Sequence, residues 1–244
     1  MRILIFFILI TNNQMIISQS DEGRITYKTK TEVFKSEKNS KKSELYKALN
    51  KLSSIRDSVS LFLDFKNSES IFFVDEKTNI GLSNEKGYSS ALNSFKTYYR
   101  NDEDKTCLMV INSDDIYQIK SKTTDIVWNI TNETKEIGIY KCIKATANVK
   151  SKNPTKGEFI KIVEAWFCPE IPINLGPNNY GGLPGLIIEL KEGKLTYYVR
   201  SINLNPDFDI SVEKPKKGKV LTQQEYFDKI PTITKDNIRE YIGN

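Results

Sequence analysis

The stretch from Trp166 to Ile187 is dense in proline and glycine, and it constrains the fold more than any other part of the chain. It begins with Trp166-Phe167-Cys168-Pro169 and ends with Gly182-Leu183-Pro184-Gly185-Leu186-Ile187. Proline fixes φ and glycine permits positive φ, so this composition sets backbone shape and supplies few reactive groups. We therefore expect a long irregular connection between two apolar strands.

Most of the remaining chain alternates apolar and polar residues, as half-buried strands do. Short turn-forming segments separate the alternating runs, which is typical of an antiparallel meander. The expected strands are 24–30, 58–66, 71–74, 107–111, 116–120, 125–131, 137–149, 158–167, 186–191 and 195–204.

Helical periodicity is confined to three short segments. One runs from Ser43 to Ile55, one follows the capping-box spacing of Thr222 and Glu225, and one runs from Thr234 to Ile242. So many strands with so few helices predict a mainly β fold: one antiparallel sheet, curled into a half-barrel or bowl because a wide twisted sheet does not stay flat.

The two longest strands are expected to form a hairpin whose paired residue numbers add to about 310. This register places Ile143 opposite Phe167, and it turns both apolar faces the same way. It also places Cys142 opposite Cys168, at a spacing that suits a disulfide. We expect this disulfide, with Cys107 left as a buried free thiol; three reduced cysteines remain the alternative because the register can slip by two residues.

The N-terminal residues 1–19 have the pattern of a signal peptide. Arg2 precedes a short apolar run, and Ser18-Gln19-Ser20 offers a cleavage site. The run is shorter than the roughly 20 apolar residues of a membrane span, and no later segment comes close. We expect export to the periplasm or cell envelope, no transmembrane segment in the mature chain, and one domain over 20–244. A buried first strand is the alternative.

Removal of residues 1–19 leaves 35 basic and 31 acidic side chains, which are interspersed along the chain. This mild excess is ordinary surface solvation and does not indicate nucleic-acid binding. The lysine-rich segment 214–219 could contact an anionic lipid or polysaccharide. A solvated loop is the favoured interpretation, since proline and glycine interrupt it and no aromatic residue is interleaved.

The chain contains no histidine. This excludes the usual general base of a Ser or Cys nucleophile and most catalytic zinc ligand sets. Phosphate-binding loops of the common types are also absent, because the glycines at 181–185 lead into a strand and not a helix. Acidic runs at 102–104 and 114–115 lack the spacing of a calcium loop. We expect no metal and no cofactor.

Carboxylate chemistry of the glycosidase type remains open, and it needs two acids facing each other across a cleft. The weak candidates are Glu164, Glu170 and Glu189, which lie in or beside the proline-rich stretch. Glu164 shares a strand face with Trp166, and a carboxylate beside an indole also suits sugar or peptide binding. Solvated strand acids are the favoured interpretation.

Several motifs follow one another between about 130 and 190. They are Ile137-Gly138-Ile139-Tyr140-Lys141-Cys142-Ile143-Lys144-Ala145, Ala165-Trp166-Phe167, Pro169-Glu170-Ile171-Pro172-Ile173, Gly176-Pro177 and Gly182-Leu183-Pro184-Gly185-Leu186-Ile187. In order and spacing they resemble the GLPGLI family of exported Bacteroidota proteins, whose biochemical activity is not established. Weaker likenesses cover 23–27 and 221–227. Cys168 departs from the family pattern, which favours a small polar residue there, so a disulfide through it would be particular to this chain.

Two functions therefore stand as hypotheses. The favoured one is a non-enzymatic envelope binding or accessory protein for a small molecule, peptide or glycan. Its contact residues would be Trp166 and Tyr180 beside the irregular connection, because long ordered loops often border ligands. The resemblance implies an association with TonB-dependent outer-membrane transport. The alternative is an envelope hydrolase that uses paired carboxylates.

Overall fold

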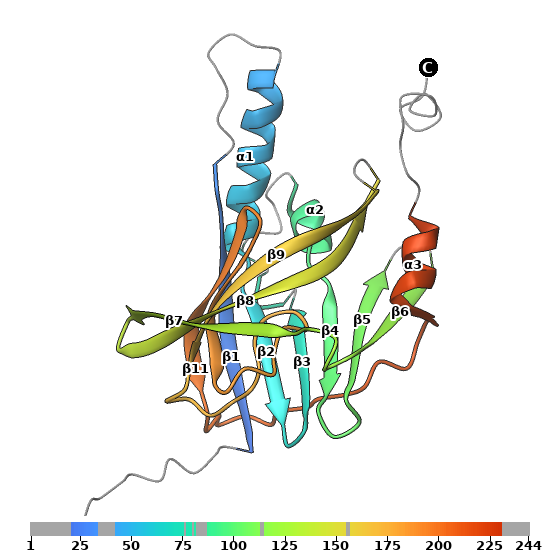
Figure 1. Ribbon diagram of the computed structural model, residues 1–244. Helices are drawn as coiled ribbons and strands as arrows, with labels where there is room; N and C mark the ends of the chain where they lie inside the picture. The colour runs from blue at the N-terminus through green and yellow to red at the C-terminus, as the bar shows by residue number, and fades with distance from the viewer. Residues whose placement is uncertain are drawn as a thin grey trace, which may run out of the picture.

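The computed structural model describes residues 21–33, 42–75, 77–79, 81, 87–112, 115–154 and 157–230. Within these ranges the chain forms one sheet of twelve strands and three helices (Figure 1). The strands are β1 Glu22–Thr31, β2 Leu61–Lys66, β3 Glu69–Val74, β4 Thr97–Asn101, β5 Thr106–Asn112, β6 Ile116–Lys122, β7 Trp128–Ile137, β8 Tyr140–Asn153, β9 Gly157–Cys168, β10 Leu186–Glu192, β11 Leu195–Asn203 and β12 Lys219–Thr222. The helices are α1 Lys42–Ser58, α2 Tyr88–Asn93 and α3 Gln223–Lys229.

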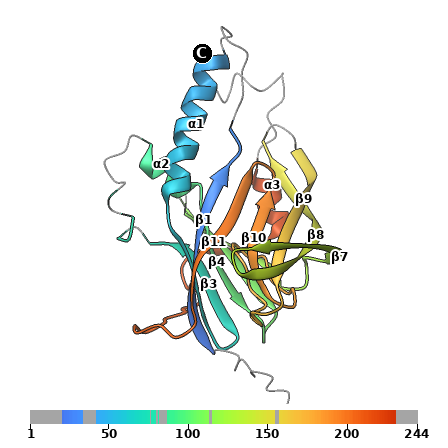
Figure 2. The same ribbon diagram turned by 90° about the vertical axis from the view of Figure 1, so that its left-hand side faces the viewer.

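The strand order in the sheet is β12-β6-β5-β4-β3-β2-β1-β11-β10-β9-β8-β7. Each neighbouring pair is antiparallel except β12 with β6, which is parallel. The sheet is strongly curled and does not close, so β7 and β12 remain its two edges (Figures 1 and 2). The predicted mainly β, curled antiparallel fold is confirmed.

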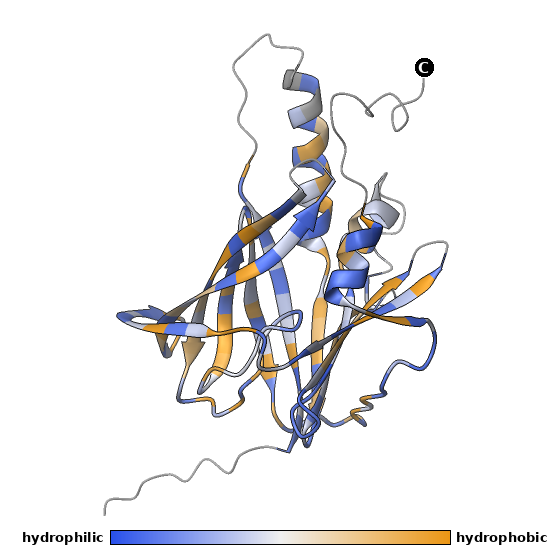
Figure 3. Ribbon diagram, turned by 45° about the vertical axis from the view of Figure 1, so that its right-hand side comes forward, coloured by the Kyte–Doolittle hydropathy of each residue, from blue (hydrophilic) through white to orange (hydrophobic). Residues whose placement is uncertain are grey.

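Hydrophobic and hydrophilic residues alternate along the strands, as the coloured bands in Figure 3 show, so that one face of a strand contributes to the core. In β1, for example, Ile25 and Tyr27 are fully buried while their neighbours are partly exposed. The strand β2 differs from the expectation of a half-buried strand, because both of its faces are covered. Arg24 lies over Phe62 and forms a 2.6 Å ion pair with the buried carboxylate of Asp64.

The expected register of the long hairpin is confirmed. Ile143 pairs with Phe167 and Ala145 pairs with Ala165, and the pairing continues without a shift to Asn153 and Gly157. The strand predicted over 137–149 was wrong at its start. Gly138 adopts a φ of +61° in a turn after Ile137, so two strands meet there.

Three elements were missed by the sequence pattern: β4, β12 and α2. The strand predicted over 58–66 begins at Leu61, because Ser58 ends α1. The helix predicted near 43–55 is confirmed as α1, which packs through Leu52 and Ile55 against α2. The capping box of α3 is present as predicted. The helix predicted over 234–242 and the signal peptide lie outside the described residues.

In the described part of the chain, no helix has both the length and the apolar character needed to cross a membrane.

Candidate functional site

Residues 169–185, which we call the plug segment, form the irregular connection between β9 and β10. Their apolar side chains are buried and join the central core: Ile171, Ile173, Leu175, Tyr180 and Leu183.

Hydrogen bonds attach the plug segment to strands that are far apart in the sheet order. The indole of Trp128 on β7 donates to the Gly181 carbonyl at 2.9 Å. The Arg100 guanidinium on β4 lies 3.5 Å from the Asn179 carbonyl oxygen. The plug segment therefore fills part of the hollow of the curled sheet and is packed against its strands.

The structure separates the two aromatic residues that the sequence singled out. Tyr180 is 4% exposed and belongs to the plug segment, whereas Trp166 is 8% exposed and lies on β9. Trp166 alternates with Ala165 and Phe167, so its side chain points to the other face of the sheet. Only Tyr180 borders the interior of the curl.

Trp166 is covered by a network of charged side chains. The ammonium of Lys135 lies 4.3 Å from the ring centroid and pairs with Glu189 at 2.8 Å. The ammonium of Lys144 pairs with Glu164 at 3.1 Å, and the indole also donates to Glu164 at 3.2 Å.

This network brings Glu164 and Glu189 to one surface, but both carboxylates are engaged by lysines. Burial opposes ionisation of Glu164, yet hydrogen bonds from Lys144 and Trp166 lower the pKa of this carboxyl below its usual value. A glycosidase acid needs a raised pKa. Glu170, the third candidate, is exposed in the turn after β9.

The three cysteines are buried free thiols in this structure, so the predicted Cys142–Cys168 disulfide is not formed. The register that suggested it holds up to Ile143 and Phe167, the residues next to the two thiols. Burial raises the pKa of Cys107 to about 11 and the pKa of Cys142 to about 12.

An interior cleft of about 270 Å³ lies between β4–β6 on one side and β8–β9 on the other. Aromatic rings contribute much of its wall: Tyr98, Tyr180, Tyr226 and Phe227. Apolar side chains from three strands complete it, among them Met109, Ile119 and Val149.

Polar and charged side chains share this lining with the aromatic and apolar ones, and among them is one ion pair. The Lys161 ammonium pairs with the Glu192 carboxylate, which also accepts a 3.0 Å hydrogen bond from the Tyr180 hydroxyl. Burial lowers the pKa of Lys161 to about 8 and raises the pKa of Tyr180. Lys150 and Lys152 also line the cleft, which thus offers ammonium and phenol groups to a small polar ligand.

The helix α3 closes this cleft on the side of the sheet edge. The ammonium of Lys152 on β8 donates to the Phe227 carbonyl at 2.7 Å. The Gln223 amide donates to the Lys150 carbonyl at 3.3 Å. These bonds join α3 to β8, so the capping box that fixes α3 also positions Tyr226 and Phe227 in the cleft wall.

Sequence reasoning missed Lys161, Glu192, Tyr98 and Tyr226. A signal for Lys161 was present, because it shares a strand face with Val163, Ala165 and Phe167 and so places a charge on a buried face. Glu192, Tyr98 and Tyr226 come from elements distant in sequence, and only the curl brings them to the same cleft.

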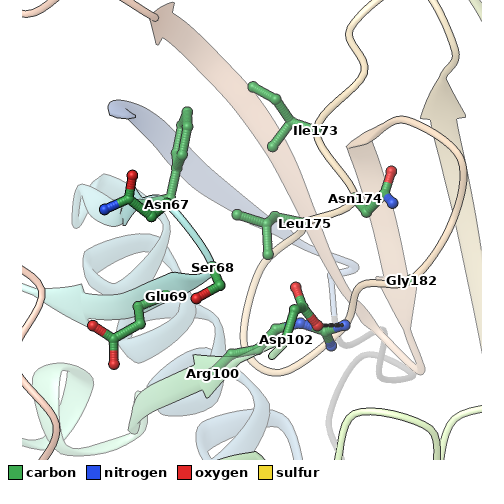
Figure 4. A pocket seen from close by; sticks show the side chains of 10 residues that line it. Asn67, Ser68, Glu69, Arg100, Asp102, Ile173, Asn174, Leu175 and Gly182 are labelled. Carbon is green, nitrogen blue, oxygen red and sulfur yellow. Dashed lines mark ion pairs between the residues drawn. The ribbon is translucent and has the colours of Figure 1, made fainter. Parts of the chain in front are cut away.

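A second cavity of about 380 Å³ lies where the β2–β3 turn, the end of β4 and the plug segment meet (Figure 4). Phe65, Ile173 and Leu175 form its apolar wall. Arg100 and Asp102 lie together in it, joined by an ion pair of 2.6 Å.

Comparison with known families gives one match within the chain. Residues 148–189 match a family described as protein of unknown function (Porph_ging). The matched segment runs from β8 through β9 and the plug segment into β10. Comparison with curated proteins gives no match.

Comparison with solved structures gives, among others, two structures of PNGF-II. The structure of PNGF-II in the P21 space group shares 17% identity over 86% of this chain, with a TM-score of 0.51. The structure of PNGF-II in the C2 space group shares 16% identity over 90% of this chain, with a TM-score of 0.46. The chain spans about a third of each of those chains, 33% and 32%. The P21 comparison shows that this fold also occurs within a longer protein.

Proposed function

We propose that this chain is a non-enzymatic binding protein that holds a small ligand in the interior cleft. The observation that carries the proposal is the lining of the cleft, where aromatic side chains lie beside lysines and the Lys161–Glu192 pair. Apolar pockets with a few converging polar groups are typical of ligand sites, and aromatic rings supply contact area at low entropic cost.

The charged groups support binding over hydrolysis. Glu192 has its lysine and tyrosine partners within the cleft. Glu164 and Glu189 lie outside the cleft lining and are paired with lysines. Glu189 borders a separate groove with Glu32 and Asp57. There, a hydrogen bond from Lys191 lowers the pKa of Glu32, and Thr29 and Thr31 donate to Asp57.

The ligand class follows from the donors. Lys161 is paired with Glu192, but Lys150 and Lys152 also line the cleft, so its lysines outnumber its one carboxylate and favour an anionic group. The hydroxyls of Tyr98 and Tyr226 can bond to the oxygens of that group. A small molecule, or the end of a peptide or glycan, with an acidic group and an apolar body satisfies both parts of the lining.

The place of action is the cell envelope. Support comes from the signal-peptide pattern of residues 1–19 and from the resemblance of the 137–187 motifs to the exported GLPGLI proteins of Bacteroidota. Through that resemblance, we propose that the protein accompanies a TonB-dependent outer-membrane transport system and handles a substrate that the system moves. N-terminal sequencing of the exported protein should begin near residue 20.

In this oxidising compartment, we expect Cys142 and Cys168 to form a disulfide, because continuation of the hairpin register places them opposite each other. Non-reducing peptide mapping of exported protein should find this bond, with Cys107 alkylated only after unfolding. A bond from Cys107 to either partner, or full alkylation of all three thiols, would contradict the expectation.

The proposed binding is tested with protein purified from its native envelope, followed by mass spectrometry of the small molecules that co-purify. Wild type should retain one ligand class, and Lys161→Met should lose it. Lys141→Met, which removes an exposed lysine of β8, should retain the ligand. Equal retention by both variants, or no retained molecule in wild type, would oppose the proposal.

A further inference from the structure

The second cavity, between Phe65 and the Arg100–Asp102 pair, is separate from the interior cleft and shares no lining residue with it. A ligand in this cavity would therefore be additional to the one proposed for the interior cleft. The cavity volume of about 380 Å³ falls within the range of small-ligand pockets.

Arg100 is the unusual residue of this cavity, because it is 6% exposed yet only partly satisfied. Its Nη2 atom pairs with Asp102, its Nη1 atom lies 3.5 Å from the Asn179 carbonyl oxygen, and its Nε atom is buried without a partner. A guanidinium carries five N–H donors, and leaving buried donors unpaired costs free energy. An additional acceptor in the cavity would lower this cost.

The plug segment leaves the guanidinium open to such an acceptor. A Cβ atom on Gly182 would lie 3.9 Å from the Nη2 atom, and a Cβ atom on Gly181 would lie 3.1 Å from the Nη1 atom. Side chains at these two positions would cover or displace the guanidinium. Gly181 therefore packs against the guanidinium, and the missing side chain of Gly182 leaves room beside the Nη2 atom.

Asp102 supplies the opposite charge. Its Oδ1 atom pairs with Arg100, and the residue is 39% exposed at the side chain, so the carboxylate also faces solvent. The nearby carboxylate of Glu69 is used differently, because it accepts hydrogen bonds from the Tyr99 hydroxyl and from Asn101. One end of the cavity thus presents a guanidinium and a carboxylate side by side.

We propose that this cavity binds a free amino acid with an apolar side chain. The ligand carboxylate would pair with Arg100, and its ammonium would pair with Asp102, so each charge meets its opposite. The apolar side chain would pack against Phe65, Ile173 and Leu175. A ligand with only one charge forms an ion pair with either the guanidinium or the carboxylate but not with both, so it binds less tightly.

Isothermal calorimetry with L-leucine tests the proposal, since leucine carries both charges and an apolar side chain. Two analogues each remove one charge: 3-methylbutylamine lacks the carboxylate, and 4-methylpentanoate lacks the ammonium. Leucine should bind at least about tenfold more tightly than either analogue, because one ion pair is lost in each case.

Asp102→Asn removes the ammonium partner and should weaken leucine binding by about tenfold or more. The matched control Asp104→Asn changes an exposed acid of the same turn and should bind leucine as wild type does. Circular dichroism checks the fold of each variant, and Ser68→Phe provides a second variant that fills the cavity and should abolish binding.

Absence of measurable leucine binding in wild type would overturn the proposal. So would an analogue that binds as tightly as leucine, or equal leucine affinities for Asp102→Asn and wild type. None of these results bears on the ligand proposed for the interior cleft. That ligand is tested separately with Lys161→Met, which changes the cleft and not this cavity.

Discussion

At the scale of single residues, Gly185 and Gly181 of the plug segment each exclude a side chain for a different physical reason. Gly185 adopts a φ of +151°, and a Cβ atom there would lie 2.1 Å from the Cys168 carbonyl oxygen. Gly181 has no room for a side chain because the Asn174 carbonyl and Arg100 approach it. The proline and glycine pattern visible in the sequence thus reflects close backbone packing around Arg100 and β9.

Replacement of Gly185 by alanine should destabilise the fold by about 3 kcal/mol or more, because it adds a clash with backbone to an unfavourable φ. The control is Gly138→Ala, where φ is +61° but no atom lies within 4 Å, and the cost should be about 1–2 kcal/mol. Urea denaturation measures both. Equal losses would show that the clash at Gly185 is relieved.

Lys161 should make stability depend on pH. Its pKa is about 8 in the folded chain against an ordinary value of 10.5, so between these values the unfolded chain binds more protons. Stability of wild type should therefore rise from pH 8 to 10 relative to Lys161→Met. Urea denaturation of both proteins across this range measures the difference. A constant difference would mean that Glu192 holds the lysine protonated throughout.

At the scale of elements, the sequence predicted the connection between β9 and β10 but not its packing. Composition indicated a long irregular segment, and periodicity indicated the β8–β9 register, which the structure confirms. The burial of Ile171, Leu175 and Leu183 could not be predicted, because irregular backbone has no period that assigns a side chain to a face. The expectation of a long irregular connection did not include this packing.

The plug segment should therefore exchange its amide protons slowly. The Gly182 amide donates to Asn174 at 2.8 Å, and the first amides of β10, those of Leu186 and Ile187, donate back to the plug carbonyls of Ile171 and Leu175 at 3.0 Å. Hydrogen–deuterium exchange should protect these amides as strongly as those of β9. The turn at Gly138 and Ile139, which connects β7 and β8, should exchange quickly and serves as the internal comparison. Fast exchange across the plug segment would instead indicate a mobile lid.

At the scale of the whole molecule, alternation was sufficient to predict one curled sheet but not which strands the curl brings face to face. The strands β4 and β12 were missed because they are short, at Thr97–Asn101 and Lys219–Thr222. β12 also pairs in parallel with β6, a contact that local patterns do not encode. The interior cleft depends on the curl of the sheet and on α3, since its walls come from β4–β6, β8–β9 and α3.

The central claim is that the interior cleft holds a ligand, and native mass spectrometry of the intact protein from its own cell envelope tests it most directly. Wild type should carry a single small-molecule adduct that denaturation releases. Ser121→Phe, which fills the cleft from β6, should carry none while remaining folded. An adduct of the same mass on both proteins, or a wild-type mass equal to that of the chain alone, would contradict the account.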